Sequence, residues 1–101
     1  MSKTLLQFDF PFQGPWGAEM PAAMEGLAAD IASEPGFLWK IWTENAETGR
    51  AGGIYLFASP EEAEAYRVKH AARLEGFGIT GITAHAFAVN DALSAITKAP
   101  L

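Results

Sequence analysis

The chain has 101 residues, half of them hydrophobic and 19% charged, which fits one globular domain and excludes a disordered chain. Its net charge of -5 argues against nucleic acid or an anionic membrane as the main partner, because both attract clustered Lys and Arg. Cysteine is absent, which excludes disulfides and thiolate chemistry, and without a signal segment or a long apolar run we expect a cytoplasmic protein.

The first two predicted elements are a strand and a helix. Residues 4–12 (TLLQFDFPF) alternate between the two faces of a strand, and one face carries four large apolar side chains: Leu6, Phe8, Phe10 and Phe12. GPWG at 14–17 predicts a turn. Apolar residues then recur at helical spacing and form one stripe: Met20, Met24, Leu27 and Ile31. Pro35 ends this helix.

A second and a third strand follow as a hairpin, over residues 37–44 and 51–57. Trp39 and Trp42 are three residues apart, so they point to opposite faces of their strand. From the alternation we expect Trp39 to lie beneath the helices, in phase with Phe37 and Ile41, and Trp42 to lie on the other face.

The start of the second helix is the clearest local signal in the chain. Ser59, Pro60 and Glu62 match a capping box with proline at the first helical position. One stripe of this helix faces the sheet: Ala63, Tyr66, His70 and Leu74. Residues 78–89 then predict a fourth strand, followed by a tail with one helical turn.

This order of elements, βαββαβ, predicts an α+β, ferredoxin-like fold in a single domain over residues 1–101. The four-stranded antiparallel sheet would carry both helices on one face, which leaves apolar side chains exposed on the other. A second copy packed against that face would cover them, so we expect a homodimer. The residues predicted for this interface are Leu5, Leu38, Lys40 and Trp42.

Four segments carry a resemblance to a known family: FQGPWG (12–17), EPGFLWKIWTE (34–44), AGGIYLF (51–57) and KHAARL (69–74). With their spacing they resemble the YdhR-like putative mono-oxygenases, small proteins of the dimeric α/β-barrel superfamily. The resemblance implies a ferredoxin-like subunit, a homodimer whose two sheets form a barrel, and a mono-oxygenase activity like that of cofactor-independent enzymes that oxidise polycyclic aromatic compounds.

His70 is the strongest catalytic candidate, because its stripe on the second helix points the imidazole toward the sheet. There it could act as a general base, or it could be a packing histidine bonded to a backbone carbonyl. Tyr55 is assigned as the donor that steadies an oxyanion. No metal site is predicted, since the spacing of His70 and His85 matches no metal motif.

An aromatic pocket between helices and sheet is predicted to bind the substrate. Trp16 is placed near its mouth, because the GPWG loop offers that side chain no strand or helix to pack on. The residues predicted to line the pocket, which could equally form ordinary core, are Phe8, Phe10, Trp16, Met20, Met24 and Trp39.

The leading hypothesis for function is a homodimeric mono-oxygenase that needs no cofactor and acts on a small phenol- or quinone-like aromatic compound. One alternative is a haem-binding or haem-degrading protein of the same superfamily, with His70 as the iron ligand. Another is a non-catalytic dimer that binds an apolar ligand.

Overall fold

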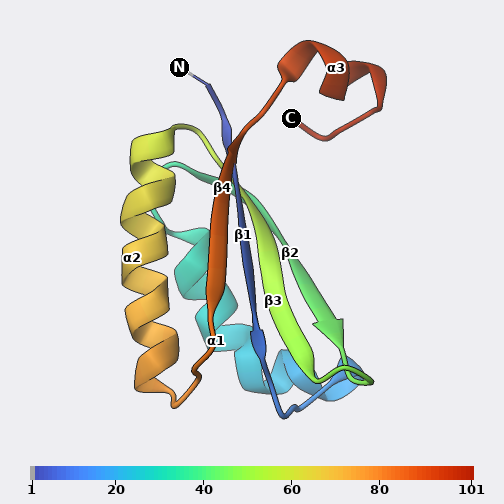
Figure 1. The fold of residues 1–101 in the computed structure, drawn as a ribbon, viewed down its shortest axis with the longest axis vertical. Coiled ribbons are helices and arrows are strands. Elements are labelled where there is room, and N and C mark those ends of the chain that lie inside the picture. Colours follow the sequence, from blue (N-terminus) through green and yellow to red (C-terminus); the bar gives the residue numbers. More distant parts are fainter. Residues whose placement is uncertain (1) are drawn as a thin grey trace.

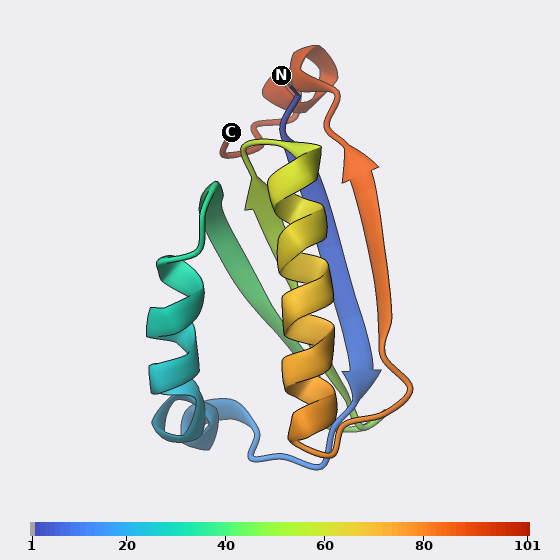
Figure 2. The same cartoon turned by 90° about the vertical axis from the view of Figure 1, so that its left-hand side faces the viewer.

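The computed structural model describes residues 2–101 and contains one four-stranded sheet with two helices on one face (Figures 1 and 2). The main elements are β1 (Thr4–Pro11), α1 (Met20–Ala32), β2 (Phe37–Asn45), β3 (Arg50–Phe57), α2 (Pro60–Gly76) and β4 (Thr83–Ala88). A 3-10 helix, η1 (Gly17–Glu19), precedes α1, and a short helix, α3 (Asp91–Ile96), follows β4. The strands pair antiparallel in the order β2-β3-β1-β4, so the predicted ferredoxin-like fold is confirmed.

Helix α2 begins as the sequence predicts. The Ser59 hydroxyl accepts a hydrogen bond from the backbone N–H of Glu62 at 3.3 Å and donates one to Glu62 Oε1 at 2.9 Å. Pro60 occupies the first turn, where its missing N–H has no partner to lose. This cap determines where α2 starts, and therefore which of its side chains face the sheet.

The hydrophobic core fills the space between the sheet and the two helices. The sheet contributes Leu6, Phe8, Phe10, Tyr55 and Phe57, and the helices contribute Ile31, Ala63, Tyr66 and Leu74. Full burial of each large apolar side chain stabilises the fold by roughly 1.5–3 kcal/mol. The alternation predicted for residues 4–12 and the helical stripes are therefore confirmed as the core-facing positions.

Strand β2 contains an irregularity that the alternation does not predict. Phe37 lies opposite Phe57, but Trp39 lies opposite Leu56, so β2 advances two residues while β3 advances one. Leu38 is the extra residue of this β-bulge, and its side chain is 45% exposed. A one-residue shift turns every later side chain of the strand to the opposite face.

The bulge reverses the expected faces of β2. Lys40 lies opposite Tyr55, and both Lys40 and Trp42 face the helices. Trp39 and Ile41 face away from them. The expectation that Trp39 and Ile41 lie beneath the helices is wrong, and so is the expectation that Lys40 and Trp42 lie on the other face, because the pattern assumed an unbroken strand.

The face of the sheet turned away from α1 and α2, called the open face below, carries Leu5, Ile41 and Phe87. Ile41 and Phe87 are 53% and 51% exposed. The C-terminal tail reaches this face, where Trp39 Nε1 donates a 2.7 Å hydrogen bond to the carbonyl of Pro100. Helix α3 extends beyond the end of the sheet (Figure 1). Within residues 2–101, no helix has the length and apolar character needed to cross a membrane.

Candidate active site

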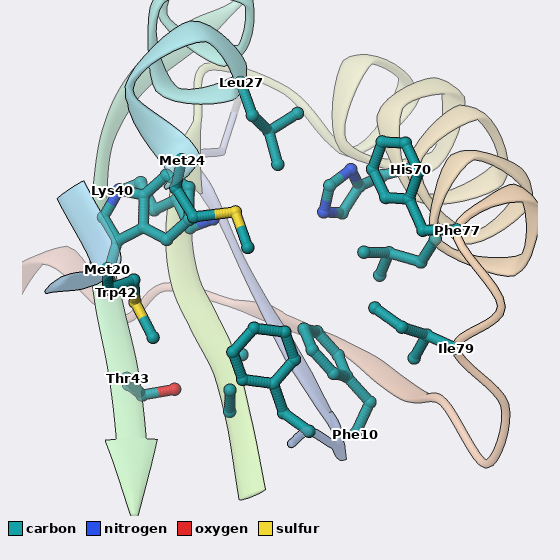
Figure 3. Close-up of a pocket in the computed structure, with 14 residues that line it drawn as sticks. Phe10, Met20, Met24, Leu27, Lys40, Trp42, Thr43, His70, Phe77 and Ile79 are labelled. Atoms are coloured by element: carbon teal, nitrogen blue, oxygen red, sulfur yellow. The ribbon is translucent and has the colours of Figure 1, made fainter. Parts of the chain in front are cut away.

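A cavity lies between α1, α2 and the helix-facing side of the sheet (Figure 3). It encloses about 40 Å³. Its apolar walls include Phe10, Phe12, Leu27, Trp42, Leu74, Phe77 and Ile79. Only three polar side chains line it, and they are Lys40, Thr43 and His70. The cavity is therefore mainly apolar, with an amine and an imidazole as its titratable groups.

A larger groove of about 400 Å³ lies next to this cavity, between α1 and the edge strand β2. The two spaces share three lining residues, Met20, Met24 and Trp42. Methionine is unbranched and adapts its shape at low cost. Movement of Met20 and Met24 would join the two spaces into one large enough for a flat aromatic molecule.

Lys40 is the charged side chain closest to the aromatic wall. Its Nζ lies 3.3 Å from the ring centroid of Trp42 and 4.7 Å from that of Tyr55. The salt bridges found within residues 2–101 involve Arg50, Arg67, Lys69 and Arg73, so Lys40 has no carboxylate partner there. Burial, together with the positive charge of Arg73, lowers the pKa of Lys40 from 10.5 to about 7. The neutral amine form of Lys40 is therefore accessible near neutral pH, unlike that of an ordinary surface lysine.

The space for the Lys40 side chain comes from a glycine on the neighbouring strand. A Cβ built on Gly53 would overlap Cε of Lys40 and would lie 3.2 Å from Cε1 of Tyr55. Any other residue at position 53 would force the lysine stem to move. The amine therefore reaches the cavity because β3 carries glycine at this point.

His70 is only 2% exposed and is held by aromatic contacts on α2 and β1. Its ring stacks on Tyr66, with centroids 5.0 Å apart and planes at 21°, and meets the edge of Phe8 at 5.1 Å. Helix α2 positions it, because residues 66 and 70 lie on one stripe. In the structure His70 therefore points toward the sheet, as the sequence predicts.

The protonation of His70 follows from its contact with Arg73. The guanidinium donates to Nδ1 of His70 from Nε at 3.3 Å and from Nη2 at 3.0 Å, and its Nη1 pairs with Asp30 of α1 at 2.5 Å. Arginine can only donate, so Nδ1 accepts and the ring proton lies on Nε2. Burial and the charges of Lys40 and Arg73 lower the pKa of His70 to about 3. The imidazole is thus a neutral hydrogen-bond donor, and it is a weak base.

The two buried tyrosines stay protonated. Burial raises the pKa of Tyr55 far above its usual range and raises that of Tyr66 to about 12. The hydroxyl of Tyr66 is buried and has no hydrogen-bond partner within the described chain. Tyr55 does not line the cavity, and its ring instead lies under the amine of Lys40.

The structure brings together only part of the predicted site. Phe10, Met20, Met24 and His70 line the cavity as expected. Phe8 lies deeper in the core, and Trp16 packs edge-on against Phe12, with centroids 5.4 Å apart, so it stands behind one cavity wall. Trp39 lies on the open face, where it contacts the C-terminal tail.

Sequence reasoning missed Lys40 and Trp42 as site residues. The two share one face of β2 with the cavity, although both were predicted for the dimer interface. The only available signal was a single lysine inside an aromatic strand, which by itself does not identify the face. Within residues 2–101, no three His, Asp or Glu side chains form a group suited to a metal ion, and His85 lies on the open face opposite Gln7.

Comparison with known proteins adds a family and a fold. The family described as "Putative mono-oxygenase ydhR" matches residues 5–100. Among solved structures, SnoaB from Streptomyces nogalater (mutant N63A), described as a cofactor-independent oxygenase, superposes with a TM-score of 0.62 at 18% identity, covering 89% of this chain and 95% of that one. No curated protein matches the chain.

Two further structures have the same fold. A putative antibiotic biosynthesis monooxygenase from Deinococcus radiodurans gives a TM-score of 0.57 at 14% identity and covers 86% of this chain and 92% of its own. NE2512, a protein of unknown function from Nitrosomonas europaea, gives 0.61 at 14% identity and covers 89% and 91%. At these identities the likeness extends to the fold alone.

Proposed function

We propose that this chain, which belongs to the ydhR family of putative mono-oxygenases, oxidises a small phenol- or quinone-like aromatic compound without a cofactor. The observation that carries the proposal is the cavity beneath the helices. It has aromatic walls, and burial lowers the pKa of its amine, Lys40, to about 7 and that of its imidazole, His70, to about 3. The description of SnoaB, a structure of the same fold, as a cofactor-independent oxygenase adds support.

The chemistry needs a substrate that supplies its own electrons. A base removes a proton from an activated phenol or enol, and the resulting anion gives electrons to O2. For a phenol, one oxygen atom enters the ring to give a quinone and the other leaves as water, so phenol plus O2 becomes quinone plus water. The protein must bind the ring, remove the proton, stabilise the anion and exclude bulk water.

The cavity offers several of these functions. Phe10, Phe12 and Trp42 are flat walls for an aromatic ring. The Nε2–H of His70 is a neutral donor for a developing oxyanion, and donors placed in a dry site lower the barrier more than they would in water. The arrangement therefore favours His70 as the donor, the role that the sequence suggested for Tyr55.

We further propose that the active form is a homodimer joined through the open face. Ile41 and Phe87 are more than half exposed there, and α3 leaves Leu93 and Ile96 exposed beyond the end of the sheet. Burying such side chains gains roughly 1.5–3 kcal/mol each. A second copy packed about a two-fold axis would cover them.

Oxygen consumption with isotopically labelled O2 tests the proposed reaction. With a panel of naphthols and hydroquinones, we expect one labelled atom in the organic product and one in water. His70→Leu, which removes the ring N–H and keeps an apolar side chain at this buried position, should lower turnover by roughly 10²–10³ if the donor acts on the transition state. Val68→Ala, at an exposed residue of α2 that lines neither the cavity nor the open face, serves as the control and should retain turnover.

Two outcomes would contradict the proposal. Saturable binding of naphthols without oxygen consumption would indicate a non-catalytic binder. A Soret band after haem titration, lost in His70→Asn, would indicate the haem-binding alternative. Both measurements use the same purified protein as the oxygen assay.

A further inference from the structure

We infer that Lys40 is the base of this site and that it takes the proton from the hydroxyl group of a phenol or enol, bound in the space that the cavity and the adjoining groove form together when Met20 and Met24 move. The inference rests on the proposed function and narrows its substrates to aromatic compounds with an ionisable hydroxyl. It also assigns a role to a residue that the sequence alone placed in the dimer interface.

The groups that surround Lys40 favour the neutral amine over the ammonium ion. From β2 and β3 it meets the rings of Trp42 and Tyr55, and α1 contributes only apolar cavity residues, Met20, Met24 and Leu27. The titratable and charged groups facing it from α2 are His70 and Arg73, and neither is negative. None of the cavity-lining residues is acidic. A buried ammonium here has no counter-charge of its own.

The position of the Lys40 side chain is fixed by its neighbours on the sheet. Gly53 leaves the space that the lysine stem occupies, since any Cβ at that residue would overlap Lys40 Cε. The Lys40 side chain can therefore lie across Gly53 and line the same cavity as His70. The lowered pKa of about 7 agrees with this geometry, because it leaves a free electron pair on Nζ at neutral pH.

The proton transfer conserves atoms and charge. The O–H bond of the substrate breaks, an N–H bond forms on Nζ of Lys40, and a neutral pair becomes an ammonium and a phenolate. The phenolate supplies the negative charge that the site lacks, and Nε2–H of His70 is available to donate to the same oxygen. A substrate whose hydroxyl is methylated has no proton to transfer, so it cannot form this ion pair with Lys40.

Anaerobic titration with 2-naphthol at about pH 8 tests the inference without any oxidation, where free naphthol is neutral and most of Lys40 is an amine. We expect the red-shifted absorption of naphtholate when the wild type binds. We also expect 2-naphthol to bind roughly 10–100-fold more tightly than 2-methoxynaphthalene, the advantage of a charge-assisted hydrogen bond. In Lys40→Met, the naphtholate band and this preference should both disappear.

Two more variants distinguish a lysine that accepts the proton from one that acts only as a permanent positive charge. Lys40→Arg keeps a cation that cannot accept a proton, so naphtholate bound to it should release one proton per site to an unbuffered solution, measured with a pH electrode. The wild type should release almost none, because Lys40 keeps the proton. Lys98→Met, which changes an exposed lysine of the C-terminal tail, is the matched control and should behave as the wild type.

The inference is overturned if the wild type binds 2-naphthol with the spectrum of the neutral form. It is also overturned if the naphtholate band persists in Lys40→Met, if the wild type releases as many protons as Lys40→Arg, or if 2-naphthol does not bind at all. Because this titration excludes oxygen, its failure is distinct from failure of the oxygenase, which only the labelled-O2 assay measures.

Discussion

The side chain of Lys40 crosses the backbone of Gly53 so closely that a Cβ on residue 53 would overlap Lys40 Cε. The two residues lie on adjacent strands, where Gly53 is the partner of Trp42. The absence of a side chain at position 53 therefore decides whether the amine reaches the cavity.

Gly53→Ala should displace Lys40 while leaving the fold intact. The new methyl group meets the flexible end of the lysine stem, so we expect a cost of roughly 1–2 kcal/mol in the free energy of unfolding. The naphtholate signal should fall by about tenfold or more, because a misplaced base loses its geometry. Urea unfolding and the anaerobic titration measure both. Gly26→Ala, where a Cβ meets nothing within 4 Å, is the control. An undiminished naphtholate signal would show that Gly53 does not position Lys40.

The pKa of Lys40 predicts how stability depends on pH. The folded pKa is about 7, below the usual 10.5, so between these values the unfolded chain holds a proton that the folded chain does not. Stability should therefore rise with pH across this window, and the penalty is complete below it. Lys40→Met should remove the rise and stabilise the protein near neutral pH by up to several kcal/mol, at roughly 1.4 kcal/mol per pKa unit.

Urea unfolding from about pH 6 to pH 10 measures this effect across the titration of lysine. Lys98→Met is the control, since it removes an exposed lysine of the C-terminal tail. Equal slopes in the wild type and Lys40→Met would mean that Lys40 titrates in the folded protein as it does in the unfolded chain.

Arg73 is a positioning residue for the imidazole. In Arg73→Met the donors to Nδ1 of His70 and a nearby positive charge are both lost, so the pKa of His70 should rise from about 3 and the Nε2–H form should lose its preference. Nitrogen NMR of the histidine ring reports the tautomer directly. Arg67→Met, which breaks an ion pair with Glu64 within α2, should leave His70 unchanged. If the Nε2–H tautomer is unchanged in Arg73→Met, Arg73 does not determine the tautomer of His70.

Met24 limits the size of the ligand. It lies on the boundary between the 40 Å³ cavity and the 400 Å³ groove, so Met24→Ala should join them. We expect anthracene-sized hydroxylated ligands to bind about tenfold more tightly relative to 2-naphthol, at a stability cost of roughly 2 kcal/mol. Met24→Leu conserves volume and should keep the wild-type preference. If the ratio of affinities does not change in Met24→Ala, ligands enter by another route.

The open face predicts a dimer that a single charge can disrupt. Phe87→Glu places a carboxylate among apolar side chains, so sedimentation at micromolar concentration should change from dimer to monomer. Val68→Glu substitutes an equally exposed residue of α2 and should leave the dimer intact. A wild-type protein that sediments as a monomer would refute the proposed assembly.

Local patterns in the sequence determined the elements and most of the core. The alternation of Leu6, Phe8 and Phe10 and the cap at Ser59 depend on neighbours within one strand or one turn, and these short-range preferences act before any distant contact forms. The stripe through His70 likewise follows from helical geometry. The order of elements then left the ferredoxin-like sheet as the arrangement with short, right-handed connections.

Only the tertiary structure decided which face of β2 each side chain occupies. Trp39 and Trp42 stand three apart, so either register buries one indole, and the strand's own pattern does not choose between them. The pairing with β3 chooses, because the bulge at Leu38 places Trp42 opposite Gly53, where there is room for the indole and the lysine stem.

The chemistry of Lys40 has the same origin. In the sequence it is one more positive charge, and only burial between two aromatic rings, beside Arg73 and without a carboxylate, makes it a base near neutral pH.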